Sequence, residues 1–147
     1  DTAPDDEDED ATASGLQIPA DVTVTFRSAG TQDGWILEST ETSGAGGSME
    51  SAATTFMLGD DAANRQYRGL LSFNTASLPD DAIITAATLN FRRTGMLGAN
   101  PFASLGNIIV DVKEGAFSNN AALQLGDFRV AGTKNYIRQY PDSKING

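Results

Sequence analysis

The stretch TTFMLGDDAANRQYRGLLSFNTASLPDDAIITAATLNF, residues 54–91, decides the fold, because apolar and polar side chains alternate along it. The runs 54–58, 69–73 and 83–91 each place apolar residues at every second position. A period of two predicts β-strands with one buried face. Pro79, which two aspartates follow, predicts a tight turn before the last run, because its ring fixes φ near the value that such turns need.

The same period of two recurs outside this stretch. It appears in three further segments, 22–26, 35–39 and 107–113. The glycine- and serine-rich segment 43–48 is expected to be a loop, and 119–128 is the one segment expected to contain a helical turn. Strands at short intervals, each with one apolar face, need a second layer to cover them. The sequence therefore predicts an all-β fold, an antiparallel sandwich of two sheets.

A family resemblance rests on four quoted pieces of the chain. They are TQDGWILESTETSGAGGSM (31–49), the stretch 54–91, GNIIVDVKEGAF (106–117) and AALQLGDF (121–128). Here the chain resembles the DNRLRE domain, a module of secreted and cell-surface proteins of bacteria and archaea that is related to a family of carbohydrate-binding modules. The match runs from about Val22 to the C-terminus, and its most specific piece is the L-G-D … R … LLSFN … LP … A-x-I-x-x-A-x-L run. The resemblance implies a jelly-roll-like sandwich, usually non-catalytic, and no particular ligand.

The C-terminal part departs from that pattern. Domains of this type continue beyond PDSKING (141–147) into a Trp-containing strand and further closing strands, and residues 129–147 show no strong strand of their own. Two explanations stay open: the chain is a piece of a longer protein, or another chain supplies the missing strands by strand exchange, with residues 11–26 as the donor. We expect a flexible acidic tail or linker at 1–20 and a sandwich at 21–147 that lacks its last strands.

Charge is distributed unevenly along the 147 residues. The formal net charge is −10, and seven of the twenty acids lie in residues 1–10, DTAPDDEDED, where there is no base. Such a segment is expected to be solvated. Nucleic acid is an unexpected partner because no basic stripe is present, and no apolar run reaches the length of a membrane span. A start at Asp1 without a signal segment fits a processed secreted protein, and equally an excised fragment.

Catalysis is not expected from this composition. The chain has no histidine and no cysteine, so the usual neutral-pH base, thiolate nucleophiles and Ser-His or Cys-His pairs are excluded. The adjacent Asp80 and Asp81 point to opposite sides of an extended chain, so they cannot face each other as a glycosidase pair. We therefore expect a protein that is not an enzyme.

One turn carries a candidate metal site. Asp60 or Asp61, with Asp33, Glu38 or backbone carbonyls nearby, could supply the hard oxygen ligands that calcium prefers. The alternative is structural: Asp60 caps backbone amides, and Arg65 and Arg68 pair with the aspartates. No EF-hand loop supports the metal site, and both readings remain open at this point.

Aromatic side chains suggest a second kind of site. Tyr67, Tyr136 and Tyr140 are candidates for stacking on sugar rings. Trp35 alternates in phase with Leu37, so we expect it to anchor the core.

Taken together, the sequence predicts a non-catalytic structural or adhesive module of an extracellular or cell-surface protein or filament. Its expected partners are copies of itself or other surface proteins, with strand exchange as the mode of assembly. The alternative is a carbohydrate-binding module attached to a secreted enzyme, with polysaccharide as its ligand.

Overall fold

The computed structural model describes residues 21–141, without the side chains of 135–139. The predicted tail at 1–20 and the last residues, 142–147, lie outside the described residues. The elements of the described part are β1 (Gly34–Glu38), β2 (Gly46–Ser51), β3 (Gly59–Asp60), β4 (Gln66–Leu70), α1 (Pro101–Ser104), β5 (Ile108–Val112), η1 (Leu125–Arg129) and β6 (Lys134–Tyr140).

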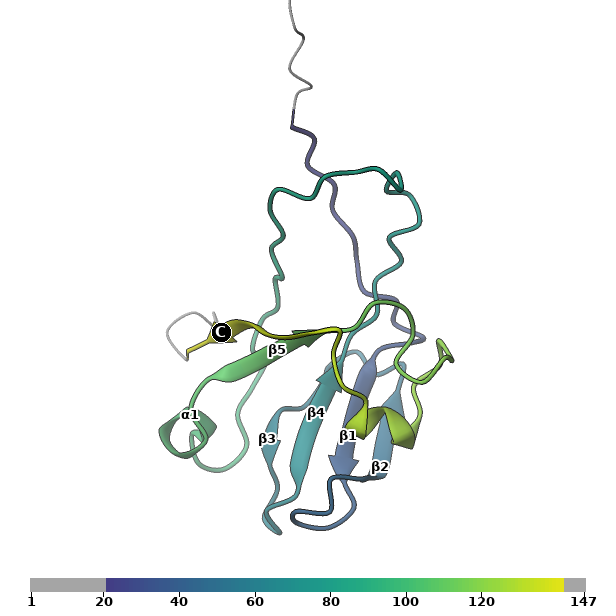
Figure 1. The fold of residues 1–147 in the computed structure, drawn as a ribbon. Coiled ribbons are helices and arrows are strands. Elements are labelled where there is room, and N and C mark those ends of the chain that lie inside the picture. Colours follow the sequence, from purple (N-terminus) through teal and green to yellow (C-terminus); the bar gives the residue numbers. More distant parts are fainter. Residues whose placement is uncertain (1–20, 142–147) are drawn as a thin grey trace, which may run out of the picture.

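The strands form two antiparallel sheets. The larger sheet has the order β2-β1-β4-β3, and the smaller one pairs β5 with β6. In Figure 1 the β5–β6 pair crosses the upper end of the larger sheet at a steep angle. The all-β, antiparallel part of the prediction is confirmed, with little helix in the described part.

The buried core lies between the larger sheet and η1. Ile36 and Leu70, from β1 and β4, pack with Leu123 and Phe128, and Ile36 and Phe128 are almost completely buried. Gly46 lets η1 approach β2 closely, because a Cβ at this position would collide with the carbonyl oxygen of Leu125. Burial of these side chains is the main stabilising term that the fold provides.

Two of the predicted strands are confirmed and a third is displaced. The run 35–39 overlaps β1, which begins at Gly34, and the run 107–113 contains β5. The run 69–73 was predicted a few residues too late, because β4 covers Gln66–Leu70. Just beyond the end of β4, the Ser72 amide donates a hydrogen bond to the Asp33 side chain.

Other local predictions are wrong. Residues 22–26, 54–58 and 83–91 belong to no strand in the described part. The segment 43–48 is not all loop, because β2 begins at Gly46 and is held by its pairing with β1. The expected helical turn at 119–128 is the 3₁₀ helix η1, displaced toward the C-terminus.

The C-terminal segment also differs from the prediction. Residues 129–147 were expected to contain no strong strand of their own, but β6 covers Lys134–Tyr140 and pairs with β5. The strand exists because β5 offers it a complementary ladder, although its own alternation of apolar residues is weak.

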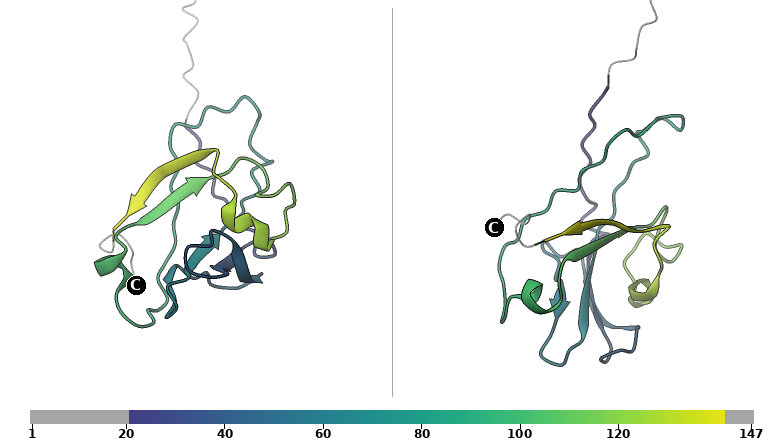
Figure 2. Two further views of the ribbon diagram at one scale, coloured as in Figure 1. Left: turned by 60° about the horizontal axis from the view of Figure 1, so that its bottom comes forward. Right: turned by 60° about the vertical axis from the view of Figure 1, so that its left-hand side comes forward.

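Two unpaired segments project from one end of the larger sheet. Residues 21–28 and the long connection 74–93 extend together beyond the strands, and both views in Figure 2 show the same arrangement. Several of their apolar side chains face solvent, with exposed fractions of 82% at Val22 and 88% at Ile83. A single bridge, between Ser28 and Phe73, ties the bases of the two segments together. Segments with a strand-like pattern are therefore present without a sheet to bury them.

Candidate functional site

The turn between β3 and β4 is organised by Asp61. Its Oδ1 accepts hydrogen bonds from the backbone amides of Ala63 and Arg65, each at 2.9 Å. Its Oδ2 accepts from Nε of Arg65 at 2.8 Å and from Nη2 of the same side chain at 2.6 Å. Asn64, with a φ of 56°, supplies the left-handed residue that closes the turn. Both carboxylate oxygens thus already have donors.

These donors change the acidity of the turn. The Arg65 side chain, followed by the Arg65 and Ala63 amides, holds the pKa of Asp61 below its ordinary value, because each donor favours the charged form. The same pair raises the pKa of Arg65. A calcium ion would have to compete with a two-bond ion pair for the same oxygens.

The three aspartates of the predicted calcium site are not brought together. Asp60 lies in β3 opposite Gln66, at one end of β4, whereas Asp33 precedes β1 at the other end. Asp33 is buried, and its Oδ1 accepts from the Ser72 amide at 2.7 Å. Among the described residues no group of three acidic, histidine or cysteine side chains is placed to hold a metal ion. Calcium binding at the Asp60–Asp61 turn stays a prediction without a ligand set.

The second arginine of the motif has a different role from the expected one. Arg68 does not pair with the aspartates of the turn. Its guanidinium lies over the ring of Phe128, and its Nη1 donates to the Phe128 carbonyl oxygen. Its Nε donates to Oε1 of Gln66 at 3.0 Å. The side chain thereby connects β4 to η1.

The candidate sugar-stacking residues do not form one platform. Tyr67 packs edge-to-face on Trp35, with ring centroids 5.4 Å apart. Tyr140, in the other sheet, packs in the same way on Phe91 at 5.2 Å, and its hydroxyl donates to the Leu89 carbonyl oxygen. The side chain of Tyr136 lies outside the described residues.

Trp35 does not anchor the core as expected. It is half-buried and absent from the buried cluster, which takes its neighbour Ile36 instead. The reason is that η1 covers the face of β1 that carries Ile36.

Pro79 begins the expected turn, and its carbonyl oxygen accepts from the Ala82 amide at 3.0 Å.

A groove with a mixed polar and apolar lining lies at the base of the projecting segments. Its volume is about 420 Å³, and four phenylalanines contribute to its lining: Phe26, Phe56, Phe73 and Phe91. Each of the four lies on the apolar face of a predicted strand. Phe56 and Phe91 meet edge-to-face at 6.1 Å. Sequence reasoning assigned these rings to core faces separately and missed that they converge on one groove that is open to solvent.

Comparisons with known proteins gave no match: no protein-family model, no curated protein and no solved structure matches this chain. Within the described residues, no helix combines the length and the apolar character needed to cross a membrane.

Proposed function

We propose that this chain is a non-catalytic structural module of an extracellular or cell-surface assembly, and that its projecting segments contact copies of itself or other surface proteins. The observation that carries this proposal is the exposure of strand-patterned segments that no sheet accommodates. Val22 and Ile83 are more than four-fifths exposed, and Ile84 is 61% exposed. Exposed apolar surface of this kind is typical of contacts between proteins.

The architecture in this proposal is a sandwich that a further strand completes. The phenylalanine groove is lined by parts of the two unpaired segments, 26–28 and 89–91, and by residues that flank the strands of the larger sheet, among them Phe56 and Phe73. Unpaired backbone next to apolar side chains is the form in which proteins accept an added strand. The jelly-roll-like architecture and the extracellular location of this proposal rest on the sequence resemblance to DNRLRE domains alone, because no family model matches the chain.

The test is the molar mass of the 1–147 chain in solution, measured by light scattering across a range of concentrations. We expect masses that rise to multiples of 15.4 kDa. A folded monomer at every concentration would remove self-association from the proposal, and binding to other surface proteins would then be tested by the same method in mixtures.

A carbohydrate-binding module is the second candidate, and the Trp35–Tyr67 pair favours it. Both rings are half-buried, so each keeps part of its surface open to solvent. Trp35 is the one tryptophan of the chain, so its fluorescence reports directly on this place. A saturable change on titration with soluble polysaccharides, lost in Tyr67→Ala but not in Tyr140→Ala, would support sugar binding there.

A further inference from the structure

Residues 21–26 and 83–92 run in the same direction within one copy. Phe26 and Phe91 both line the groove, whereas Val22 and Ile83, nearer the N-terminal end of each stretch, are exposed and do not line it. In Figure 1 the segment 21–28 descends toward the sheet, and the connection 74–93 rises from β4 and then descends in its second half. Within one copy, any ladder between them would therefore be parallel.

A parallel ladder places like charges together. If Val22, Val24 and Phe26 aligned in phase with Ala87, Leu89 and Phe91, Arg27 would lie opposite Arg92. Both arginines are exposed, and like charges directly opposite destabilise a strand pair. This is consistent with the structure, in which the two segments form no ladder.

In an antiparallel ladder, each apolar side chain lies opposite an apolar one and each polar side chain lies opposite a polar one. Aligning Val22 with Phe91 gives the opposite pairs Asp21–Arg92, Val22–Phe91, Thr23–Asn90, Val24–Leu89, Thr25–Thr88 and Phe26–Ala87. One face of this ladder is entirely apolar. The other is polar and carries an acid opposite a base, an arrangement that stabilises a strand pair. Sliding the register by two residues in either direction loses the Asp21–Arg92 pair.

Antiparallel pairing requires a second molecule, because the two segments of one copy are parallel. We propose that residues 21–26 of one copy pair antiparallel with residues 87–92 of a second copy, and that Val22 and Val24 enter the partner's groove beside Leu89 and Phe91. This inference rests on the proposed function and names its partner and its contact.

The placement of the two segments also predicts the symmetry of the assembly. Donor and acceptor project from the same end of each copy (Figure 2), so two copies that form one pair bring the second donor and acceptor face to face. A two-fold dimer with two identical ladders results, in which each contact occurs twice. Its mass is twice 15.4 kDa.

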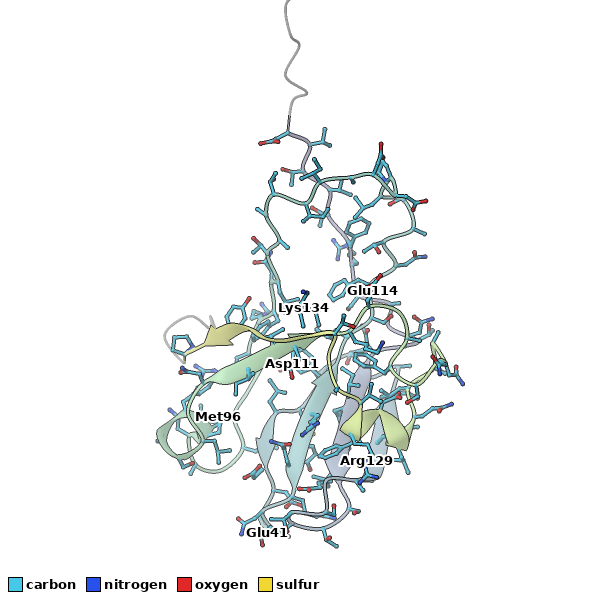
Figure 3. All side chains as sticks on the ribbon, viewed as in Figure 1. Glu41, Met96, Asp111, Glu114, Arg129 and Lys134 are labelled. Carbon is cyan, nitrogen blue, oxygen red and sulfur yellow. The ribbon has the colours of Figure 1, made fainter. Side chains whose placement is uncertain are left out.

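The first test exchanges the charges of the Asp21–Arg92 pair at the end of the ladder. Asp21→Lys and Arg92→Glu are each expected to raise the dimer dissociation constant about tenfold, because two ion pairs become two repulsive pairs. The double variant Asp21→Lys/Arg92→Glu is expected to recover the dimer. Glu41→Lys is the matched control, because this exposed acid lies at the opposite end of the molecule (Figure 3). Measurements at about 0.15 M salt limit long-range repulsion between the acidic chains.

The second test determines the register of the ladder by disulfide crosslinking. The chain has no native cysteine, so only the introduced cysteines can form disulfides. A mixture of Thr23→Cys and Asn90→Cys chains is expected to form a mixed disulfide on oxidation, because directly opposite residues have the spacing that a disulfide needs. Thr23→Cys mixed with Thr85→Cys is the control, and it is expected to remain uncrosslinked.

The outcomes separate this inference from the proposed function. Crosslinking at 23–90 together with charge-swap recovery supports the dimer. Oligomers that persist without the 23–90 crosslink overturn the ladder but leave the structural module intact. An intramolecular crosslink in Thr23→Cys/Thr88→Cys would show that the segments pair in parallel within one copy, and would also overturn the ladder. A folded monomer under all conditions overturns both self-association and the ladder.

Discussion

The guanidinium of Arg68 lies 4.3 Å from the centre of the Phe128 ring, and the same side chain donates to the Phe128 carbonyl oxygen. The two residues are sixty positions apart in the chain. One belongs to the central strand β4 and the other to η1. This contact fixes the cover of the core against the sheet through a cation over a ring, reinforced by a charge-assisted hydrogen bond.

The ring of Phe128 should therefore matter more than its apolar volume alone. Phe128→Ala is expected to lower the free energy of unfolding by about 3–5 kcal/mol. Phe128→Leu keeps most of the volume but removes the aromatic face, and should cost about 1–2 kcal/mol. Urea unfolding measures both. Leu125→Ala, at a partly exposed position of the same helix, is the control and should change stability by less than about 1 kcal/mol. Equal losses in all three variants would contradict a specific role for the ring.

Acid should weaken the turn between β3 and β4. The pKa of Asp61 in the folded chain lies below the ordinary value of 3.8, so the ion pair with Arg65 stabilises the fold fully above that value. Its contribution is lost as the pH falls through the lowered pKa. The melting temperature of Asp61→Asn should thus lie below that of the parent chain at pH 6, and the gap should close toward pH 2. Asp60→Asn, at the exposed neighbour, is the control. A gap that is constant with pH would argue against the ion pair.

Gly69 controls the position of a groove residue. A Cβ at Gly69 would overlap the ring of Phe56, so Gly69→Ala must displace that ring. We expect a loss of about 1–3 kcal/mol in the free energy of unfolding. Gly95→Ala is the matched control, because nothing lies within 4 Å of the Cβ built there. If Gly69→Ala were as stable as the parent chain, Phe56 would have to move at no cost, and its packing against β4 would be unimportant.

Calcium should leave the melting temperature unchanged. A ligand that binds only the folded state raises stability by mass action, so a calcium site would appear as a difference between excess calcium and excess chelator. Both oxygens of Asp61 already accept hydrogen bonds, and Asp33 lies at the other end of β4. A clear rise in melting temperature with calcium, abolished in Asp60→Asn, would revive the metal site at this turn.

The alternation of apolar and polar residues predicted the strands that also have a pairing partner in a sheet. The alternation around Ile36 and around Val110 is strong, and β1 and β5 are found there. The sequence GGSMES of β2 has little intrinsic strand preference and becomes a strand through its pairing with β1. Residues 22–26 and 83–91 show the reverse case: the pattern is clear, but no ladder partner is present in the described part.

The sequence predicted individual residues of the candidate site, but not how the fold brings them together. Asp61 and Arg65 are close in sequence, and their pairing follows from a turn of a few residues. The groove joins Phe26, Phe56 and Phe91, which come from widely separated segments, and only the tertiary arrangement brings them together. Likewise, no local signal directs Arg68 toward Phe128 rather than toward the neighbouring aspartates.

The order in which the core is assembled along the chain has a consequence for biosynthesis. The larger sheet is complete once Leu70 has been made, yet the residues that cover Ile36 and Leu70 are Leu123 and Phe128. A nascent chain that has emerged only to the end of β4 therefore presents its future interior to water. Ribosome-bound chains should resist protease only when Phe128 has cleared the exit tunnel, and until then the uncovered sheet is the surface that a holding chaperone would recognise.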